Sequence, residues 1–518
     1  MAEGRTIIPF RVPRGGERND IPSHELGLEN LVVCQNMLRN NKGELVLRPG
    51  YQQFVSPGPA QRIMSLIYYR TTALADRTVA GTTVGWWQFN GVSWADISGT
   101  ALTGTSTDEI RFAVFPEGTP IVYNLIGVNN VDSPKLWNGA AATYSALGGS
   151  PPTAADVAAA SNRVLMLVRP NTIRVSAINN SASWPAANAA ILADAGDILI
   201  GMERMTRTTV GILGDRSQWI AKPQQGTFPF RFDLISEQPG PVSAKAIIRW
   251  GNSLYYLADD GNVYQFDGIS CKPVGNAMEN FVVANMSFTN KTMSHAFYLY
   301  EFKVLCWLFP SGTSTSPDYG FYYNPISGEM GRLLFGTGIT ASAVWKSVAL
   351  IKWADLSSYT WANIAATYPT WASFGSAAKK SAILGDVNGQ VHMVGLGPGS
   401  DNGGAVEGIW EFPLLSPGGV DKAFRPATFE SWFEKTVNAT TIETDVANSD
   451  TLMSTRTLTD ADDIDISVDS RKDIDLAKLN LETRFTSIRH RVSTTTGNVK
   501  FKGGCFSGDV QRVEGGPT

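Results

Sequence analysis

The chain has 518 residues, with 43 Lys and Arg against 47 Asp and Glu, and a formal net charge of −4. Only 17% of the residues are charged, while 50 are Gly and 10% are aromatic, a composition that favours short strands and turns and excludes a disordered chain. It also excludes a protein that wraps nucleic acid with a general basic surface, and the four scattered Cys do not form the clusters of a zinc site or a disulfide framework.

The first residues, "MAEGRTIIPFRVPRGG", contain no apolar signal-peptide core, and no run of 18 apolar residues occurs in the chain. We therefore expect a protein that is made and kept in a cytoplasm, neither secreted by a signal nor anchored in a membrane.

Residues 1–56 are predicted to form an N-terminal arm followed by a strand that leads into the next domain. The arm mixes arginines with prolines, glycines and apolar side chains. Because such a segment cannot form a core by itself, we expect it to dock on another protein chain. The residues assigned to this docking are Arg5, Ile8, Phe10, Arg11, Arg14 and Arg18.

Most of the chain after the arm consists of short apolar and aromatic runs that are separated by Gly, Asn, Asp and Pro. These runs predict an all-β protein. Helical periodicity is nearly absent, and the best helix candidates are the Ala-rich segments 152–163 and 183–196. The predicted strands include "RIMSLIYYR", "EIRFAVF", "TPIVYNL", "RVLMLV", "TIRVSAI", "TTVGIL", "FYLYEFKVLCWLF" and "GQVHMVG".

Aromatic strands that end in Asn-Gly or Asp-Gly turns recur along the chain. These dipeptides suit tight hairpins, whose central residues need a positive φ. From Gly91 to Gly139 is 48 residues, and from Gly139 to Gly268 is 129, or three units of 43. A repeat of this length is typical of a β-propeller blade. We predict a propeller of six or seven blades over residues 57–400; the alternative is a β-sandwich of unrelated hairpins.

The stretch 250–268, "WGNSLYYLADDGNVYQFDG", is interpreted as the inner edge of one blade. Its aromatic side chains are expected to pack between blades. Asp259 and Asp260 are expected to be turn residues and not an acid–base pair, because adjacent residues of a strand point to opposite faces.

Residues 401–518 are predicted to form a separate β-sandwich-like domain, some of whose strands could return to the propeller. Within it, residues 459–476 are rich in Asp and include Asp462 and Asp463. The alternation of Asp and Ile there favours a solvated strand, and loose calcium binding is the alternative.

No pattern of catalytic or metal-ligating residues is found. His24, His295, His392 and His490 lie far apart, and neither a nucleophile elbow nor a phosphate-binding loop occurs. We therefore predict a protein that is not an enzyme and that binds no metal or cofactor.

The segment "CQNMLRNNKGELVLRPGYQQF" (34–54) resembles the opening segment of the tail nozzle and hub proteins of short-tailed bacteriophages, also known as packaged-DNA stabilisation or tail tubular proteins. The matching positions are Asn36, Gly43, Leu45, Arg48, Pro49 and Gly50. A second resemblance to these proteins covers residues 210–268, at Gly214, Ser217, Trp219, Asp260, Gly261, Asp267 and Gly268.

The resemblance implies a structural protein of the virion tail that is assembled in the host cytoplasm. Its propellers would form a homohexameric ring that closes the DNA exit channel and conducts the genome during ejection. The implied partners are further copies of the chain, an adaptor or portal-proximal protein, tail fibre or tip proteins, and double-stranded DNA that passes without sequence specificity. The low positive charge fits such a channel, since each contact of Lys or Arg with phosphate would add affinity and drag.

Two other functions are compatible with the patterns. One is a glycan-binding or glycan-degrading propeller of the phage tail, a receptor-binding or depolymerase component that would gather arginines and paired carboxylates at one face. The other is a propeller that serves as a general binding scaffold outside any phage.

Overall fold

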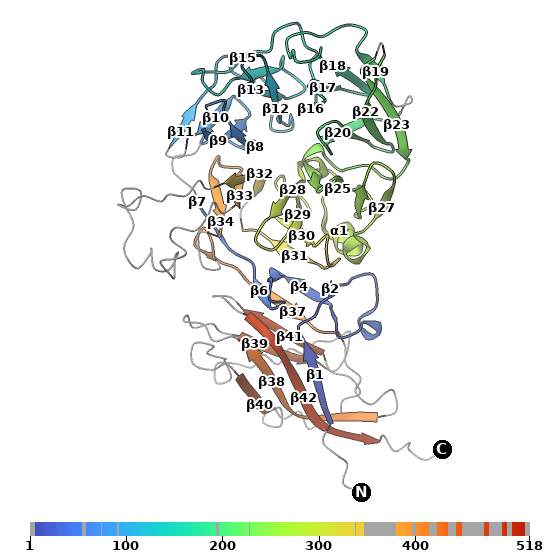
Figure 1. Ribbon diagram of the computed structural model, residues 1–518. Coiled ribbons are helices and arrows are strands. Elements are labelled where there is room, and N and C mark those ends of the chain that lie inside the picture. The colour runs from blue at the N-terminus through green and yellow to red at the C-terminus, as the bar shows by residue number, and fades with distance from the viewer. Residues whose placement is uncertain are drawn as a thin grey trace.

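The computed structural model describes residues 6–53, 59–73, 75–90, 93–192, 196–226, 228–336, 338–346, 380–395, 400–413, 422–433, 442–447, 471–475, 489–494 and 500–512. Its dominant feature is a ring of four-stranded antiparallel units, each of which runs outward from an inner strand (Figure 1). Six of these units are separate sheets, and a seventh forms the beginning of a ten-stranded sheet.

The strands of the first three blades are β8 (Ile63–Arg70), β9 (Asp76–Thr82), β10 (Trp86–Phe89), β11 (Trp94–Asp96); β12 (Arg111–Glu117), β13 (Val122–Val128), β14 (Lys135–Trp137), β15 (Ser145–Ala146); and β16 (Asp156–Ala160), β17 (Arg163–Val168), β18 (Thr172–Val175), β19 (Ala189–Ile191). The next two blades consist of β20 (Leu199–Arg204), β21 (Val210–Gly214), β22 (Gln218–Pro223), β23 (Phe230–Ser236); and β24 (Ile247–Trp250), β25 (Ser253–Leu257), β26 (Val263–Phe266), β27 (Cys271–Pro273).

The sixth blade consists of β28 (His295–Leu299), β29 (Val304–Phe309), β30 (Tyr319–Tyr323) and β31 (Met330–Leu334). The seventh consists of β32 (Ile339–Lys346), β33 (Lys380–Asp386) and β34 (Val391–Val394), and its fourth strand is β7 (Tyr51–Gln53) from the N-terminal part of the chain. The ring is therefore closed by pairing the beginning of the propeller sequence with its end.

The inner strands contact one another in the cyclic order β8, β12, β16, β20, β24, β28, β32 and back to β8. This arrangement confirms the predicted β-propeller and gives it seven blades. The turns that revealed the repeat occupy one structural position, since Asn90, Asn138 and Asp267 each follow the third strand of a blade. They belong to the first, second and fifth blades, which explains why the longer spacing of 129 residues covers three units.

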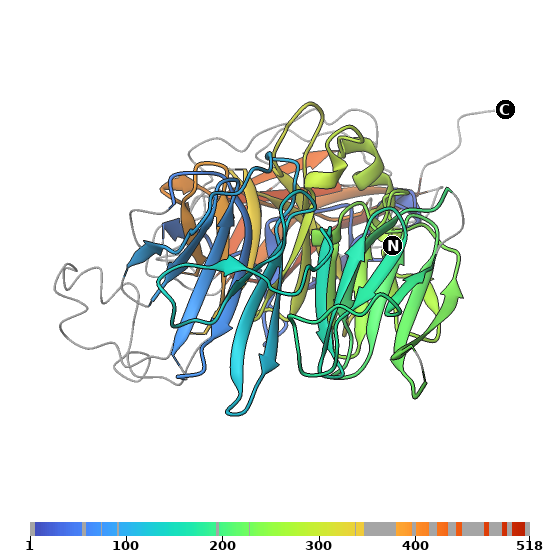
Figure 2. The same ribbon diagram turned by 90° about the horizontal axis from the view of Figure 1, so that it is seen from above.

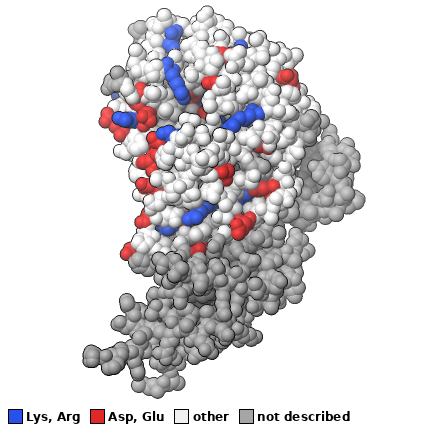
Figure 3. All heavy atoms as spheres, turned by 180° about the vertical axis from the view of Figure 1, so that it is seen from behind, with Lys and Arg blue, Asp and Glu red and all other residues white. Residues whose placement is uncertain are grey.

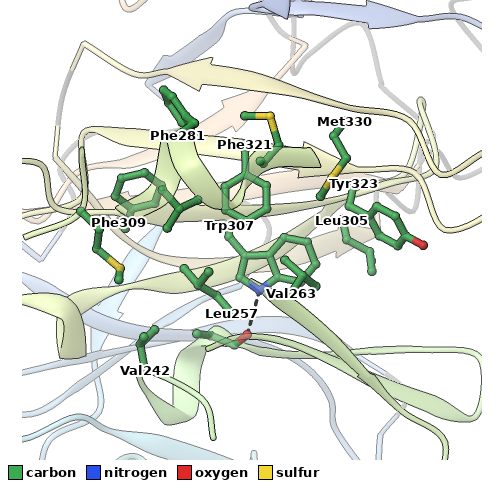
Figure 4. Close-up of a cluster of buried hydrophobic side chains, with 14 of the residues drawn as sticks. Val242, Leu257, Val263, Phe281, Leu305, Trp307, Phe309, Phe321, Tyr323 and Met330 are labelled. Atoms are coloured by element: carbon green, nitrogen blue, oxygen red, sulfur yellow. Dashed lines mark hydrogen bonds between the residues drawn. The ribbon is translucent and has the colours of Figure 1, made fainter. Parts of the chain in front are cut away.

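Each junction between neighbouring blades contains its own hydrophobic cluster. The cluster between the fifth and sixth blades surrounds Trp307, which is fully buried (Figure 4). The Trp307 ring stacks on Phe321 with 5.5 Å between ring centres, and its Nε1 donates to the Ala246 carbonyl at 2.9 Å. Aromatic packing and one directional bond thus fix the register of two blades.

Both Ala-rich helix predictions are wrong. Residues 156–160 form the inner strand β16, and residues 189–191 form β19. The alanines of β16 are buried between blades, where small side chains allow close approach, so tertiary packing overrides helix propensity. The one α-helix among the described residues, α1 (Glu279–Asn285), joins the fifth and sixth blades and lies on one face of the disk, which is seen edge-on in Figure 2.

The stretch 250–268 is not the inner edge of its blade, as predicted, because β25 and β26 are the two middle strands and β24 is the inner one. Its aromatic residues do pack between blades: Tyr255 belongs to the cluster with the sixth blade, and Tyr256, Tyr264 and Phe266 belong to the cluster with the fourth. Asp259 and Asp260 lie in the turn between β25 and β26, as expected.

Both ends of the chain build the region next to the propeller (Figure 1). The strands involved are β1 (Thr6–Arg11), β2 (Gly16–Glu17), β3 (Asn30–Leu31), β4 (Val33–Gln35), β5 (Met37–Arg39), β6 (Leu45–Leu47), β35 (Ser400–Asp401), β36 (Gly404–Ala405), β37 (Gly408–Glu411), β38 (Lys422–Phe433), β39 (Ile442–Ala447), β40 (Arg471–Asp475), β41 (Arg489–Thr494) and β42 (Lys500–Arg512). The short 3-10 turns are η1 (Ser23–Glu25), η2 (Ala244–Ala246), η3 (Asn276–Met278) and η4 (Lys291–Met293).

These strands fall into two larger sheets and the small two-stranded sheet β35-β36. One has the order β40-β38-β42-β6-β5, with β1 also paired to β42, and the other continues from β31 of the sixth blade through β4, β37 and β41 to β39. C-terminal strands therefore join the propeller through N-terminal ones.

The structure shows that part of the N-terminal arm pairs with a strand of its own chain, which the sequence did not predict. Its residues 6–11 form β1, which pairs antiparallel with β42 from Thr6 opposite Gly508 to Arg11 opposite Gly503. An extended segment can satisfy its backbone groups by joining a sheet edge, even without a core of its own. Docking of the arm on a partner stays a prediction.

Replacing Trp307 tests the packing between blades. We expect Trp307→Ala to lower the free energy of unfolding by about 3–5 kcal/mol through lost burial and a cavity. Trp307→Phe should cost less, about 1–2 kcal/mol, because it removes mainly the bond to the Ala246 carbonyl. Urea unfolding followed by circular dichroism measures both. Ile269→Ala, at a side chain that is 85% exposed, is the control, and equal stability of Trp307→Ala and this control would contradict the assignment.

Candidate functional site

The first group of motif residues lies at the junction between the propeller and the adjoining sheets. Asn36 stands between β4 and β5 with a φ of 54°, a left-handed conformation that Asn tolerates better than most residues. Its Nδ2 donates to the Glu407 carbonyl at 2.7 Å, and its Oδ1 accepts from the Leu334 N–H at 2.9 Å. One amide therefore connects the C-terminal segment with the sixth blade.

Arg48, which follows β6, completes this junction. Its side chain is only 2% exposed and forms a two-point ion pair with Asp401, in which Nη1 donates to Oδ1 at 2.9 Å and Nη2 donates to Oδ2. The Nε donates to Asn36 Oδ1 at 3.0 Å, and Nη2 also donates to the Leu334 carbonyl at 2.6 Å. The guanidinium lies 4.4 Å from the centre of the Phe335 ring. Planar, multiply bonded burial of this kind requires arginine, since lysine could not make these contacts together.

Glycine is required at Gly50 and at Gly43 of the motif for different structural reasons. A Cβ on Gly50 would lie 2.0 Å from the Ser400 carbonyl oxygen, so only glycine lets the closing strand pass this segment. Gly43 has a φ of 85° and forms the turn between β5 and β6. Leu45 is buried in β6.

Two further ion pairs are buried beside β31. Glu17 is fully buried and accepts from Arg332 Nε and from the Cys34 N–H at 2.9 Å. Burial raises the pKa of Glu17, and the positive charge of Arg332 opposes this effect. Glu329 Oε2 lies 2.9 Å from Arg39 Nη2, and burial raises the pKa of this carboxyl to about 7. Two ion pairs thus hold N-terminal segments against the sixth blade, and the third, Arg48 with Asp401, joins an N-terminal segment to a C-terminal one.

The propeller axis is occupied at one end by Lys245 of η2. Its side chain is 8% exposed, and its Nζ lies 3.4 Å from Glu109 Oε1. The same Nζ donates to the Thr340 carbonyl at 3.4 Å and to the Met64 carbonyl at 3.5 Å. Lys245 precedes the fifth blade, whereas its three partners belong to the second, seventh and first blades. The side chain therefore reaches across the axis.

His295, the first residue of β28, is also buried in this axial region. Burial and the nearby charge of Lys245 lower its pKa to about 3. It is therefore neutral at physiological pH. The bonds of Lys245, and not His295, connect the blades at this end of the propeller.

A pocket of about 810 Å³ lies on one face of the fourth and fifth blades. We call this face the upper face; it carries the loops that join one blade to the next and the loops between the second and third strands of a blade. The residues that line this upper-face pocket are Leu192, Asp197, Asp215, Arg216, Ser217, Trp219, Leu234, Glu237, Gln238, Pro239, Asp259 and Asp260.

Hydrogen bonds fix several of the polar groups that line the pocket. Ser217 Oγ donates to Asp197 and accepts from Trp219 Nε1 at 2.8 Å, so that these three side chains form one chain of bonds. Asp260 Oδ2 accepts from Tyr264 Oη at 2.7 Å. Burial, followed by this bond to Asp260, raises the pKa of Tyr264, which therefore remains a donor. The pocket is thus organised by its own side chains.

The structure separates the motif residues into two places and leaves some outside both. Ser217, Trp219 and Asp260 meet in the upper-face pocket, where a Cβ on Gly214 would lie 2.8 Å from Ser217 Oγ. Gly261 belongs to the same turn as Asp260. Asp267 and Gly268 form the turn between β26 and β27, and thus belong to the opposite face.

The arm residues do not converge on either place. Arg18 pairs with Asp20 at 2.6 Å, and Arg11 and Arg14 are exposed. Arg5 lies outside the described residues, and of Ile8 and Phe10 only the position in β1 is described.

Sequence reasoning missed Lys245, Asp197 and Glu237, because each stands in a different loop without a motif. A lone lysine among small residues, as in "VSAKAII", was the only signal for the axial side chain. The carboxylates of the pocket come from four separate loops, and their proximity follows only from the ring.

The remaining sequence candidates have structural partners or lie outside the described chain. His392 Nε2 lies 2.9 Å from Asp386 Oδ2 within the seventh blade, and its ring packs against Tyr51. Among the described residues no group of His, Cys, Asp or Glu could hold a metal ion, and no described helix is long and apolar enough to cross a membrane. Of the acidic stretch, only residues 471–475 are described, as β40, so Asp462 and Asp463 lie outside.

Comparison with known proteins yields fold similarity only. No protein-family model and no curated protein matches the chain. Among solved structures, YCF48 bound to a D1 peptide is similar over 67% of this chain and 99% of its own, with 9% identity and a TM-score of 0.38. BamB from Moraxella catarrhalis matches 66% of this chain and 99% of its own at 14% identity and a TM-score of 0.34. Sqt1 from Saccharomyces cerevisiae matches 56% and 95% at 10% identity and a TM-score of 0.31.

Removing Arg48 tests the junction. We expect Arg48→Ala to lower the free energy of unfolding by about 3–5 kcal/mol, because Asp401 would remain buried without its partner. The matched control is Arg18→Ala, which breaks a two-point pair with Asp20 at the surface and should cost about 0–1 kcal/mol. Urea unfolding of both variants is the measurement. Similar losses in the two would show that the Arg48 pair is not the stronger constraint.

Glu329 predicts a pH dependence of stability. Its pKa is about 7 in the folded chain against 4.5 for an unperturbed glutamate, so the folded state holds the proton more tightly. The free energy of unfolding should therefore fall as pH rises from about 4.5 to 7, by up to about 3 kcal/mol from this group. Glu329→Gln cannot ionise, so the stability of this variant relative to the natural chain should rise over the same pH range. A constant difference from pH 4.5 to 8 would contradict the shift.

Proposed function

We propose that this chain is a structural subunit of a phage tail nozzle, a homohexameric ring that closes the DNA exit channel and later conducts the genome. The proposal rests first on the resemblance of two segments to tail nozzle and hub proteins. One structural observation carries it further: the motif residues Asn36, Arg48 and Gly50 make the junction between the propeller and the adjoining sheets. The resemblance thus falls on residues that determine how the domains are joined, as expected for a shared architecture.

The contacts of Lys245 across the propeller axis support a route for DNA that lies outside the single propeller. Lys245 crosses the axis and contacts carbonyls of the first and seventh blades, so a duplex would not pass through a single propeller. A passage would have to lie between subunits of a ring. A rigid disk with short outer strands is suited to such assembly.

The surface charge also favours a protein that conducts DNA and not one that binds DNA tightly. On the face of the molecule seen in Figure 3, Lys and Arg are few and lie among Asp and Glu over a largely uncharged surface. Because affinity for DNA grows with each phosphate that is neutralised, such a surface would let DNA slide.

Open sheet edges offer a means of joining subunits. Among the described strands, β40 ends one of the two larger sheets at the junction and β39 ends the other. An edge strand has backbone groups that can pair with a strand of a neighbour. Repeated head-to-tail contacts of one kind around an axis would close a ring.

The partners in this proposal are further copies of the chain, an adaptor or portal-proximal protein, tail fibre or tip proteins, and double-stranded DNA. The place of action is the virion tail, after assembly in the host cytoplasm. The rival function, a glycan-binding or glycan-degrading tail component, would use the upper-face pocket, which contains several carboxylates and Trp219 but a single arginine, Arg216.

The assembly state of the purified full-length protein tests the proposal. We expect six-fold rings with a central hole in electron micrographs, and a matching mass by light scattering, either alone or after addition of the adaptor from the same phage. The Arg48→Ala variant should lose rings in proportion to its loss of folded protein.

A protein that stays monomeric with the adaptor present would refute the nozzle function. Release of sugar from host polysaccharide by the purified protein would favour the glycan-degrading alternative.

A further inference from the structure

The upper-face pocket is an open hollow whose lining includes an exposed aliphatic side chain. Leu234, which lines it, is 43% exposed, and Ile198, whose carbonyl accepts from the Asp215 N–H, is 45% exposed. Ile191, which precedes the lining residue Leu192, is 75% exposed. Leu234 belongs to the lining, whereas Ile191 and Ile198 are the chain neighbours of the lining residues Leu192 and Asp197. An exposed aliphatic side chain in a hollow is typical of a surface that a partner covers.

The pocket also carries an excess of negative charge. Five carboxylates line it, at Asp197, Asp215, Glu237, Asp259 and Asp260, against one lining cation, Arg216. Lys291 reaches the rim but is paired with Asp259 at 2.6 Å. Arg216 Nε lies 3.9 Å from Asp215, and the two side chains are 85% and 51% exposed, so this pair is loose. Among the described residues, no Lys, Arg or His lies within ion-pair distance of Glu237 or Asp260.

The two properties together define the ligand. A positively charged group would find carboxylates on several sides, and aliphatic neighbours of that group would cover Leu234 and Ile198. A glycan fits less well, because its hydroxyl groups would face aliphatic side chains that cannot bond to them. The half-buried Trp219 ring adds a surface on which a guanidinium can stack.

We propose that the upper-face pocket binds a peptide segment of a partner protein in which an arginine is flanked by aliphatic residues. Arginine is favoured over lysine because its planar fork can bond to a carboxylate at two points and stack on an aromatic ring at once.

The site is organised before the ligand arrives. Asp197 is held by Ser217 Oγ and by the Arg216 N–H at 3.1 Å, and Asp260 is held by the Tyr264 hydroxyl and the Asn262 N–H at 2.9 Å. Fixed acceptors lose little conformational freedom on binding, which increases affinity for a matching cation. This inference does not depend on the nozzle function, since the pocket belongs to a single propeller.

Peptide binding to the purified full-length protein tests the site. The probe is a fluorescein-labelled peptide Gly-Leu-Arg-Leu-Arg-Leu-Gly, measured by fluorescence anisotropy, with a peptide in which Glu replaces both Arg as the comparison. We expect saturable binding of the first peptide only. The double variant Asp215→Asn with Glu237→Gln should weaken it at least tenfold, and Trp219→Leu at least fivefold.

Glu407→Gln is the matched control, because it removes one exposed carboxylate outside the pocket and should change binding less than twofold. Thermal unfolding of each variant separates loss of binding from loss of fold. Equal binding of both peptides, equal weakening by the control, or binding of neutral oligosaccharides without binding of the arginine peptide would overturn the proposal.

Discussion

The buried guanidinium of Arg48 is the constraint on which the rest of the structure depends. A propeller has no natural beginning, so its ring is stable only if the last blade is joined to the first part of the chain. Here β7 supplies the outer strand of the seventh blade, and Arg48 lies three residues before it. Through Asp401, Asn36 and Leu334, the guanidinium holds this strand to the sixth blade and to the segment that follows the seventh. The contacts of Arg48 therefore contribute both to closure of the ring and to attachment of the adjoining sheets.

The energetic basis of this junction differs from that of the blades. Blade contacts are made by hydrophobic clusters that repeat around the ring, and each tolerates a range of apolar side chains. The junction uses buried ion pairs, which stabilise only when both partners and their geometry are present. Glu17 with Arg332 and Glu329 with Arg39 form further buried pairs along β31, in which burial raises the pKa of both carboxyls, so these pairs position segments more than they stabilise them. We infer that the blades give stability and that the ion pairs specify which segments meet.

The propeller axis and the upper-face pocket are separate from the junction formed by the ion pairs. Lys245 crosses the axis at one end of the propeller and contacts carbonyls of the first and seventh blades, so DNA would not be expected to pass through it. Most residues of the upper-face pocket lie on loops, whereas Leu192 and Trp219 also pack in the cluster between the third and fourth blades. A propeller that has the proposed peptide site on its upper face, and β39 and β40 as edge strands among the described residues beside it, is compatible with the proposed ring subunit.

The sequence by itself predicted many of the strands and the length of the repeat, because turn dipeptides and strand alternation are local properties of the chain. It joined β28 and β29 into one strand over 297–309. The residues of the junction motif were identified by their resemblance to tail nozzle proteins. The sequence was wrong about the Ala-rich segment 152–163, since alanine favours helices locally and is needed in β16 for close packing of blades. Only the tertiary structure decided that the arm pairs with β42, that Lys245 crosses the axis, and that Asp197, Asp215, Glu237 and Asp260 share one pocket. These contacts join residues from different blades or from opposite ends of the chain, and no local pattern records which loops a closed ring brings together.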